Sequence, residues 1–317
     1  MSQEYDPFDD LCSVWFDDPK RGLIAVLVVY SDASYNHRHA ARPTEPLLHT
    51  VGCYVAHVDD WRKFRKEWRS ELSKVNLEYF HQTEFDYAQN AAITGKELKP
   101  EHPYCGWKAE RFVPFQKRLH QVIRRGKRKD SPRLVGFVSS IVKADFDKWL
   151  PSELKDDPGC KSYYTFNVAI NMEGVVRWAD FNNISGEIHY VFAGGDNETG
   201  NLEKWFDTLW NNDIARKRYR LSKGYTRMGF DVQWMKGEPA LQAADVAAYE
   251  FNKVAITALQ NDGPRPIDQS KLRKSVINLC REPQAHLPLI LDEEGLSLAT
   301  VEMAKFKAKH GGAWALI

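Results

Sequence analysis

The chain lacks the signatures of several large enzyme classes. It contains no Gly-x-x-x-x-Gly-Lys loop, no Gly-x-Gly-x-x-Gly turn and no Gly-x-Ser-x-Gly elbow. These motifs cradle phosphates, bind dinucleotides and expose a nucleophilic serine, respectively. Their absence leaves nucleotide-driven motors, dinucleotide oxidoreductases and serine hydrolases without support.

Cysteine and long apolar runs are also scarce. The five cysteines are scattered, and no two form a Cys-x-x-Cys pair. This pattern argues against structural zinc and favours a reducing compartment, so we expect a cytoplasmic protein. The longest apolar run, residues 23–30, is far shorter than a membrane span. The start of the chain is acidic rather than basic like a signal peptide, so no membrane association is expected.

The charges are balanced over the 317 residues, with 44 basic and 43 acidic side chains. Such a balance gives no global attraction to nucleic acid or membrane, and only local patches can supply one. A hydrophobic content of 43% is enough to bury a full core. The oligomeric state stays open.

Strand-like and helix-like segments alternate along the chain. Apolar runs predict strands at residues 23–30, 50–58, 77–85, 134–142, 187–193 and 229–235. Apolar residues recur every three to four positions in helices predicted at about 61–75, 108–125, 163–181, 202–219 and 240–259. Expected helix-starting residues are Asp59 or Asp60, Ser162 and Pro239.

This alternation predicts one α/β domain over residues 21–260, with a mixed sheet flanked by helices. Residues 1–20 are predicted to form an acidic N-terminal arm. Residues 261–317 are expected to add helices that pack on the same domain. No repeat or low-complexity linker marks a second domain.

Four acidic residues from distant parts of the chain adjoin apolar segments: Asp32, Glu84, Asp196 and Asp245. At an effective dielectric constant near 20, two carboxylates about 4 Å apart repel by roughly 4 kcal/mol. If these acids converge, they therefore need a cation between them. Ligands that are all oxygen favour Mg²⁺ or Mn²⁺. Without its cation, such a cluster should raise the pKa of at least one acid.

Four motifs resemble those of one bacterial and phage family. They are Tyr-Ser-Asp-Ala-Ser at 30–34, Phe-His-Gln-Thr-Glu-Phe at 80–85, Gly-Trp at 106–107 and Leu-Gln-Ala-Ala-Asp-Val-Ala-Ala-Tyr-Glu at 241–250. Through them the chain is similar, over about residues 23–255, to the family catalogued as domain of unknown function 3800. Ala33 departs from the family pattern, in which Glu commonly follows the first Asp.

The resemblance implies a ribonuclease-H-like fold and metal-dependent phosphodiester chemistry. In such a site a strand-borne carboxylate bridges two cations roughly 3.5 to 4 Å apart. One ion activates water and the other stabilises the leaving oxygen. On this scheme Asp32 bridges the ions and Asp245 holds one of them. Asp196 or Glu84 completes the set, and the reserve ligands are Glu198 and Glu250.

His81 lies three residues before Glu84 and is a further candidate. In a strand it would share a face with Thr83, and either side chain could orient water or bind a phosphate oxygen. Glu84 would then face the other way. The alternative is a buried, hydrogen-bonded histidine with no chemical role.

A basic stretch between Arg216 and Arg227 contains no acid and includes Tyr219 and Tyr225. Aromatic faces can stack on bases while cations bind phosphates, so the stretch is a candidate nucleic-acid interface. The alternative is a solvated helix end followed by a turn. The predicted contacts are Arg216, Arg218, Arg220, Lys223 and Arg227.

These features lead to one main hypothesis and two alternatives. The main hypothesis is a Mg²⁺- or Mn²⁺-dependent phosphodiester hydrolase, foremost a nuclease acting on DNA or RNA by two-metal chemistry. The first alternative is a nucleic-acid- or partner-binding module that keeps the acidic residues but does not cleave. The second is an enzyme acting on a small phosphorylated substrate.

Overall fold

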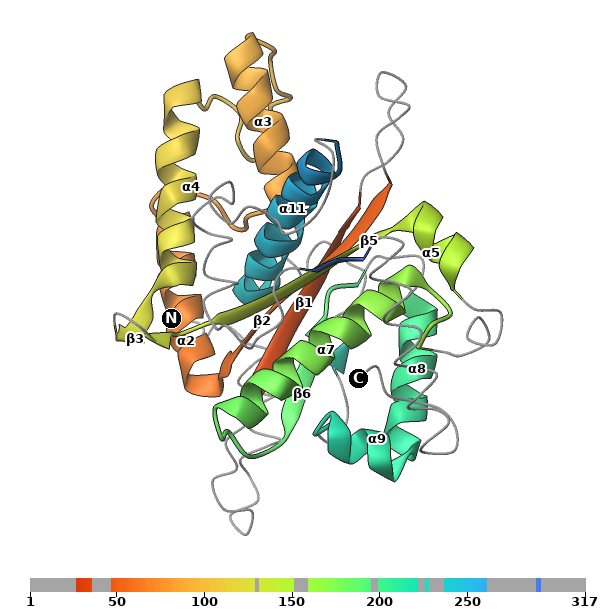
Figure 1. The fold of residues 1–317 in the computed structure, drawn as a ribbon. Coiled ribbons are helices and arrows are strands. Elements are labelled where there is room, and N and C mark those ends of the chain that lie inside the picture. The colour runs from red at the N-terminus through yellow and green to blue at the C-terminus, as the bar shows by residue number, and fades with distance from the viewer. Residues whose placement is uncertain are drawn as a thin grey trace.

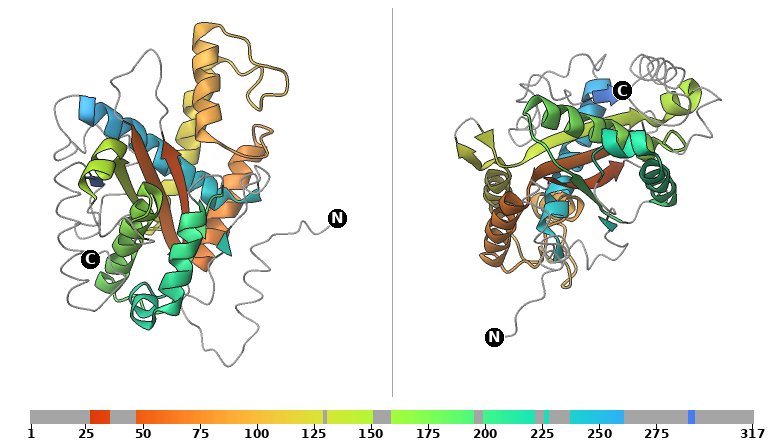
Figure 2. Two further views of the ribbon diagram at one scale, coloured as in Figure 1. Left: turned by 90° about the vertical axis from the view of Figure 1, so that its right-hand side faces the viewer. Right: turned by 90° about the horizontal axis from the view of Figure 1, so that it is seen from below.

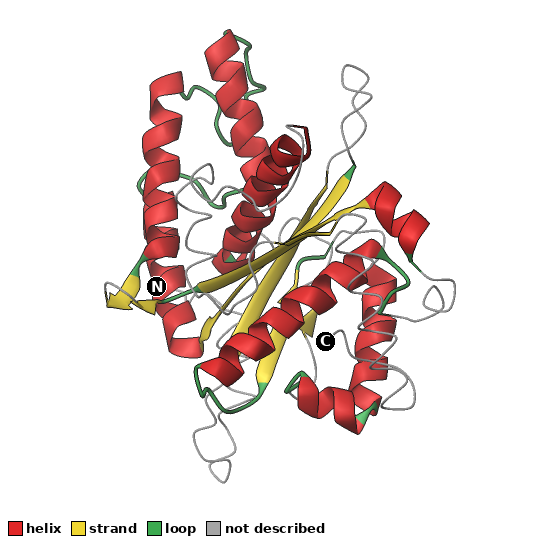
Figure 3. Ribbon diagram, in the orientation of Figure 1, coloured by secondary structure: helices red, strands yellow, loops and turns green. Residues whose placement is uncertain are grey.

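The computed structural model of the protein describes residues 27–35, 47–128, 131–150, 159–194, 199–221, 226–227, 237–260 and 289–291. The predicted acidic arm and the strand predicted at 229–235 lie outside these residues, as does most of the C-terminal extension. The described chain is an α/β fold with a mixed sheet flanked by helices, as predicted (Figures 1 and 3).

The sheet has the strand order β7-β6-β1-β2-β5-β8. Its centre consists of β6 (Ile188–Phe192), β1 (Leu27–Tyr35), β2 (Leu48–His57) and β5 (Val135–Val142). The outer strands β7 (Thr226–Arg227) and β8 (Leu289–Leu291) are short, and β3 (Gly126–Arg128) forms a separate pair with β4 (Ser131–Pro132). β2 is antiparallel to both β1 and β5, whereas β6 is parallel to β1. β7 and β8 are parallel to β6 and β5, respectively.

Two groups of helices cover the two faces of the sheet (Figures 1 and 2). One face carries α2 (Val58–Ser73), α3 (Gln82–Thr94), α4 (Ala109–Arg124) and α11 (Pro239–Gln260). The other carries α5 (Lys143–Trp149), α7 (Tyr163–Phe181), α8 (Thr199–Asn211) and α9 (Asp213–Arg218). Because side chains alternate along a strand, Val28 and Tyr30 of β1 join the first core and Leu27 and Val29 the second.

The helix α11 lies against the central strands β1 and β2. A Cβ atom at Gly52 of β2 would come within 2.6 Å of the backbone nitrogen of Ala248, so only glycine permits this approach. Gly52 is paired with Asp32 of β1, and directly opposed residues share a face of the sheet. The small residues of α11 therefore bring this helix to the face that carries Asp32.

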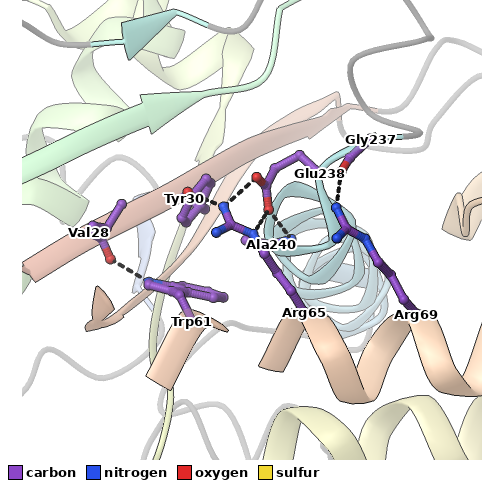
Figure 4. A network of polar contacts seen from close by, with 8 residues as sticks. All are labelled: Val28, Tyr30, Trp61, Arg65, Arg69, Gly237, Glu238 and Ala240. Carbon is purple, nitrogen blue, oxygen red and sulfur yellow. Dashed lines mark hydrogen bonds and ion pairs between the residues drawn. The ribbon is translucent and has the colours of Figure 1, made fainter. Parts of the chain in front are cut away.

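A buried ion pair fixes the beginning of α11 to α2 (Figure 4). Arg65 donates through Nε to Oε1 of Glu238 at 2.8 Å and through a terminal nitrogen to the Tyr30 hydroxyl at 2.6 Å. Glu238 also accepts the backbone N–H of Ala240 at 2.9 Å. The two charged residues are only 3% and 4% exposed, so each depends on the other for compensation.

Two predicted features around the sheet are wrong. Residues 77–85 do not form a strand, because the chain is irregular before Gln82 and helical from there on. A short apolar run does not distinguish a strand from a buried helix start, and here Phe80 and Phe85 pack on each other with ring centroids 5.3 Å apart. In addition, β1 continues to Tyr35, so Asp32 lies within the strand and not after it.

The helices follow the prediction more closely. Ser162 caps α7 as predicted, by accepting the backbone N–H of Thr165 at 3.1 Å. The helix predicted at 202–219 is divided in two at Asn212, whose side chain caps α9. α2 begins at Val58, so neither Asp59 nor Asp60 is its cap. In the extension predicted to be helical, residues 289–291 add strand β8 to the sheet.

Candidate acidic site around His81

His81 and Glu84 lie together at the beginning of α3. His81 directly precedes the helix and Glu84 is in its first turn, so the two side chains meet on one face. Nδ1 of His81 is 3.7 Å from Oε1 of Glu84. The other oxygen of Glu84 accepts a hydrogen bond from the Tyr79 hydroxyl at 2.9 Å. The predicted strand would have separated His81 from Glu84, and the helix brings them together.

Asp245 of α11 is buried against the same turn. Its Oδ2 accepts the backbone N–H of Gln82 at 2.7 Å, which is one of the donors that a helix start leaves unsatisfied. A negative charge at a helix N-terminus is also favoured by the helix dipole. Three residues earlier, Gln242 accepts the backbone N–H of Phe80 at 3.0 Å. The 241–250 and 80–85 motifs are therefore in direct contact.

The negative charge of Asp32 also acts on His81. Asp32 is partly buried in β1, on the face covered by α11, and its Oδ1 accepts the backbone N–H of Ala33 at 2.8 Å. Its negative charge is one of those that raise the pKa of His81. Three of the four predicted metal ligands thus gather near one histidine.

The pKa of His81 reports the convergence of these acids. Burial lowers this pKa, but the close contact with Glu84 and the negative charges of Asp245, Glu84 and Asp32 outweigh burial and raise it to about 9. His81 is therefore an imidazolium at neutral pH. Its positive charge lies among the carboxylates.

The acids themselves shift in opposite directions. The contact with His81 lowers the pKa of Glu84, against the effect of burial. Burial raises the pKa of Asp245, with smaller contributions from the charges of Glu84 and Asp86, while His81 and the N–H of Gln82 oppose the rise. A raised pKa in one acid is the predicted behaviour of a clustered site, but its main cause here is burial.

The donor set suits a hard cation, although it does not make a complete metal centre. Carboxylate oxygens such as those of Asp32, Glu84 and Asp245 are the ligands that Mg²⁺ and Mn²⁺ prefer. Within the part of the chain that the structure describes, no three His, Cys, Asp or Glu side chains are arranged to hold an ion. Asp196 and Glu198 lie outside that part. The shared-metal geometry stays a prediction.

Three polar residues of this region were not predicted from the sequence: Tyr79, Asp86 and Tyr104. Asp86 accepts hydrogen bonds from the side chain of Gln82 at 2.9 Å and from the Tyr249 hydroxyl at 3.1 Å, and so ties α3 to α11. Tyr79 belongs to the apolar run before His81, and Tyr104 lies just before the Gly-Trp motif. Neither position carries a local signal for a site.

The reserve ligand Glu250 turns toward α4. It is buried and accepts a hydrogen bond from the side chain of Gln116 at 3.4 Å. This contact joins α11 to α4 within the helical layer. It gives Glu250 a structural role.

The basic stretch predicted to contact nucleic acid is partly neutralised within the protein. Its arginines form the ion pairs Arg216 with Asp213, Arg218 with Glu173 and Arg220 with Asp180. Two of the acidic partners lie in α7, far from the basic stretch in sequence. The stretch contains no acid of its own, but the fold supplies acidic partners for its arginines. The pairing weakens the case for a dedicated phosphate-binding face.

The aromatic part of that prediction is wrong for Tyr219. This residue is buried and packs edge-on against Trp205, so its ring is not available to stack on a base. Lys223 and Tyr225 lie outside the described residues. The backbone of Arg227 belongs to β7, and its side chain is likewise outside the description.

Comparisons of the chain with family models, with curated proteins and with solved structures gave no match. None of the described helices is long and apolar enough to span a membrane. Function is therefore inferred from the chemistry of the site.

We expect the His81 imidazole to titrate near pH 9. Because the folded pKa lies above the ordinary value of 6.5, protonated His81 stabilises the fold fully below pH 6.5. That contribution is lost as the pH rises through about 9. An NMR titration of the ring C–H resonances measures this pKa. Glu84→Gln should lower it and Asp60→Asn should not, whereas a wild-type value at or below 6.5 would contradict the arrangement.

Proposed function

We propose that the protein is a Mg²⁺- or Mn²⁺-dependent phosphodiester hydrolase, foremost a nuclease. The observation that carries the proposal is that Asp245 contacts the helix start that holds His81 and Glu84, while Asp32 lies on the sheet face covered by the same helix, α11. These acids come from β1, α3 and α11, which are far apart in the sequence. Gathering carboxylates against their mutual repulsion is unfavourable, so such groups are typical of sites whose function needs the charge.

The sheet supports the ribonuclease-H-like core that the motif resemblance implies. Such a core has three antiparallel strands and two further strands parallel to the first. The order β5-β2-β1-β6-β7 fits this pattern, with β6 and β7 parallel to β1. In this scheme the strand-borne acid is Asp32 and the late-helix acid is Asp245.

In the proposed site, Asp32 and Asp245 would hold the ions, with Glu84 or Asp196 completing the set. When bound, the ions would activate water and stabilise the leaving oxygen. The chain itself fixes Asp245 through the Gln82 N–H and keeps His81 protonated. With Nδ1 turned to Glu84, the Nε2–H of His81 would donate to a phosphate oxygen.

Nucleic acid is the proposed substrate, and the paired arginines can still contribute to its binding. The side chains of Arg216 and Arg218 are 37% and 39% exposed despite their ion pairs. A guanidinium has five N–H donors, so one acidic partner does not exhaust it. Such contacts would position a backbone without reading its sequence.

Asp32→Asn tests the metal site directly. The substitution keeps the size of a partly buried side chain and removes its charge, so we expect a folded protein whose Mn²⁺ affinity falls at least about tenfold. Calorimetric titration with Mn²⁺ measures the affinity, and Asp60→Asn on α2 is the control. Unchanged affinity in the folded Asp32 variant would exclude Asp32 as a ligand. A wild type that binds no Mn²⁺ would remove the metal-dependent function.

A non-cleaving binding module is the second candidate. It is favoured by the charge of His81, because an imidazolium among the acids reduces their need for a metal cation. A labelled single-stranded oligonucleotide distinguishes the two functions. Binding of the oligonucleotide without cleavage, with either Mg²⁺ or Mn²⁺ present, would favour the module.

A further inference from the structure

The outer surface of α2 is basic. Its apolar stripe is buried, and the opposite face carries the exposed cations Arg62, Lys63, Lys66 and Arg69. Lys66 lies three residues after Lys63 and three before Arg69, so these side chains are neighbours on the helix. Like charges at this spacing repel and slightly destabilise a helix. Asp59, the one exposed acid of α2, already pairs with Arg62 at 3.0 Å.

α4 lies beside α2 and extends this surface (Figure 1). Arg118 of α4 is 3.3 Å from Glu71 of α2, and Lys117, next to it in the chain, is exposed. The charged residues of α4 are mostly basic, with Glu110 set against Arg111, Lys117, Arg118 and Arg124. The two helices together therefore present an excess of positive charge.

The acids between α2 and α4 do not neutralise this excess, because other cations already bind them. Each acid has two basic partners: Glu67 pairs with Arg125 and Arg133, and Glu71 with Lys74 and Arg118. Lys63, Lys66 and Lys117 form no ion pair with any residue that the structure describes. The chain as a whole has a net charge of only +1, so the excess is local.

α2 also contacts the helix that carries Asp245. Nε1 of Trp68 donates to Oε1 of Gln242 at 2.8 Å. The same oxygen accepts the backbone N–H of Phe80, which directly precedes His81. Packed helices lie about 8 to 10 Å apart, so a polyanion bound along α2 is held about one helix away from the acidic group.

We propose that the outer surface of α2 and α4 binds the phosphate backbone of a nucleic acid. The choice of nucleic acid as the polyanion rests on the proposed function, whereas the surface itself rests on the unpaired lysines. A polynucleotide suits this surface because its successive phosphates can neutralise several cations at once and release their counterions. Lys63, Lys66 and Lys117 then contact phosphates without reading the base sequence.

This surface differs from the basic stretch between Arg216 and Arg227. In that stretch the arginines 216, 218 and 220 each have an acidic partner within the protein. On α2 and α4 the exposed lysines have none among the described residues. We therefore expect α2 and α4 to supply the larger part of the electrostatic affinity for a polynucleotide.

The double variant Lys66→Gln with Lys117→Gln removes one lysine from each helix. Glutamine keeps a long side chain that suits a helix and loses the charge. The matched control is Lys161→Gln with Lys204→Gln. These lysines are also exposed, but they lie just before α7 and in α8, on the other side of the sheet. Fluorescence anisotropy of a labelled single-stranded DNA oligonucleotide measures binding over a salt series, with EDTA present so that no cleavage occurs.

The Lys66 and Lys117 double variant should bind the oligonucleotide about tenfold more weakly than the wild type. Its plot of log affinity against log salt should be flatter by about 1.4, or about 0.7 for each lost phosphate contact. The control should keep the affinity and slope of the wild type. Neither variant loses an ion pair, so the urea midpoint of unfolding should not fall in either. Unchanged binding by the test variant, or equal losses in both variants, would overturn the inference.

Further outcomes separate this inference from the proposed function. A wild type that binds phosphatidylserine vesicles but not the oligonucleotide would assign the surface to a membrane and overturn the inference. If the wild type hydrolyses bis(4-nitrophenyl) phosphate with Mn²⁺ while the test variant binds the oligonucleotide normally, the inference alone fails. If the wild type binds the oligonucleotide through these lysines but hydrolyses neither compound, the hydrolase fails and the surface is supported as part of a binding module.

Discussion

Asp245→Asn is expected to reduce Mn²⁺-dependent phosphodiester hydrolysis by about a hundredfold to a thousandfold without making the protein less stable. Asparagine keeps the size of the side chain and an oxygen that can accept the N–H of Gln82. It loses the charge that a cation would need. Burial raises the pKa of Asp245, so the charged form is disfavoured in the folded state and the neutral replacement avoids that cost.

The pH dependence of this stability difference has a defined sign. The folded pKa of Asp245 lies above its ordinary value of 3.8, so the contribution of this group to stability is fully present below pH 3.8. It is lost as the pH rises through the raised folded pKa. The advantage of Asp245→Asn should therefore appear as the pH rises through that interval. Urea unfolding at acid and neutral pH measures it.

Asp60→Asn is the control for Asp245→Asn. Asp60 is as buried as Asp245, but it lies in the first turn of α2 and not in α11. Its replacement should leave hydrolysis unchanged. If Asp245→Asn proved less stable than the wild type at neutral pH, the attraction between Asp245 and His81 would outweigh burial. A variant with lower activity and undiminished stability is the pattern expected of a residue kept for function.

The helix that carries Asp245 could be predicted in detail from its sequence. Leu241, Ala244, Ala248 and Phe251 recur at helical spacing, and all four are buried in the structure. The adjoining polar stripe, which includes Gln242 and Asp245, is typical of a solvated face. It is buried instead, because α2 and α3 cover it and take its hydrogen bonds.

The beginning of α3 could not be predicted because nonlocal contacts determine it. Residues 77–85 have the apolar character of a strand, yet the N–H groups of Phe80 and Gln82 are bound by side chains of α11. No window of neighbouring residues contains that information. The same limitation applies to Arg218, whose acidic partner Glu173 lies in α7. The sequence identifies the charged and polar residues, but the nonlocal contacts of the fold determine which of them lie together.

Glu238→Ala is expected to lower the free energy of unfolding by about 3 to 5 kcal/mol. The substitution leaves the guanidinium of Arg65 buried without a counter-charge and removes the acceptor for the Ala240 N–H. Urea denaturation at neutral pH measures the loss. The control is Glu67→Ala, because Glu67 pairs with Arg125 and Arg133 nearer the surface. Exposed pairs contribute about 1 kcal/mol or less, so the control should change stability little.

Removing both charges separates the ion pair from packing. Replacing Arg65 by Met and Glu238 by Leu leaves no unpaired buried charge, so the double variant should be more stable than Glu238→Ala alone. If the double variant is equally unstable, the lost cap at Ala240 and the packing around Tyr30 account for the effect instead.

The ion pair between Arg65 and Glu238 also anchors the first turn of the helix that carries Asp245. Under conditions in which the Glu238→Ala variant remains folded, we therefore expect it to bind Mn²⁺ more weakly than the wild type. The reason is that Asp245 would be held less firmly at the beginning of α3.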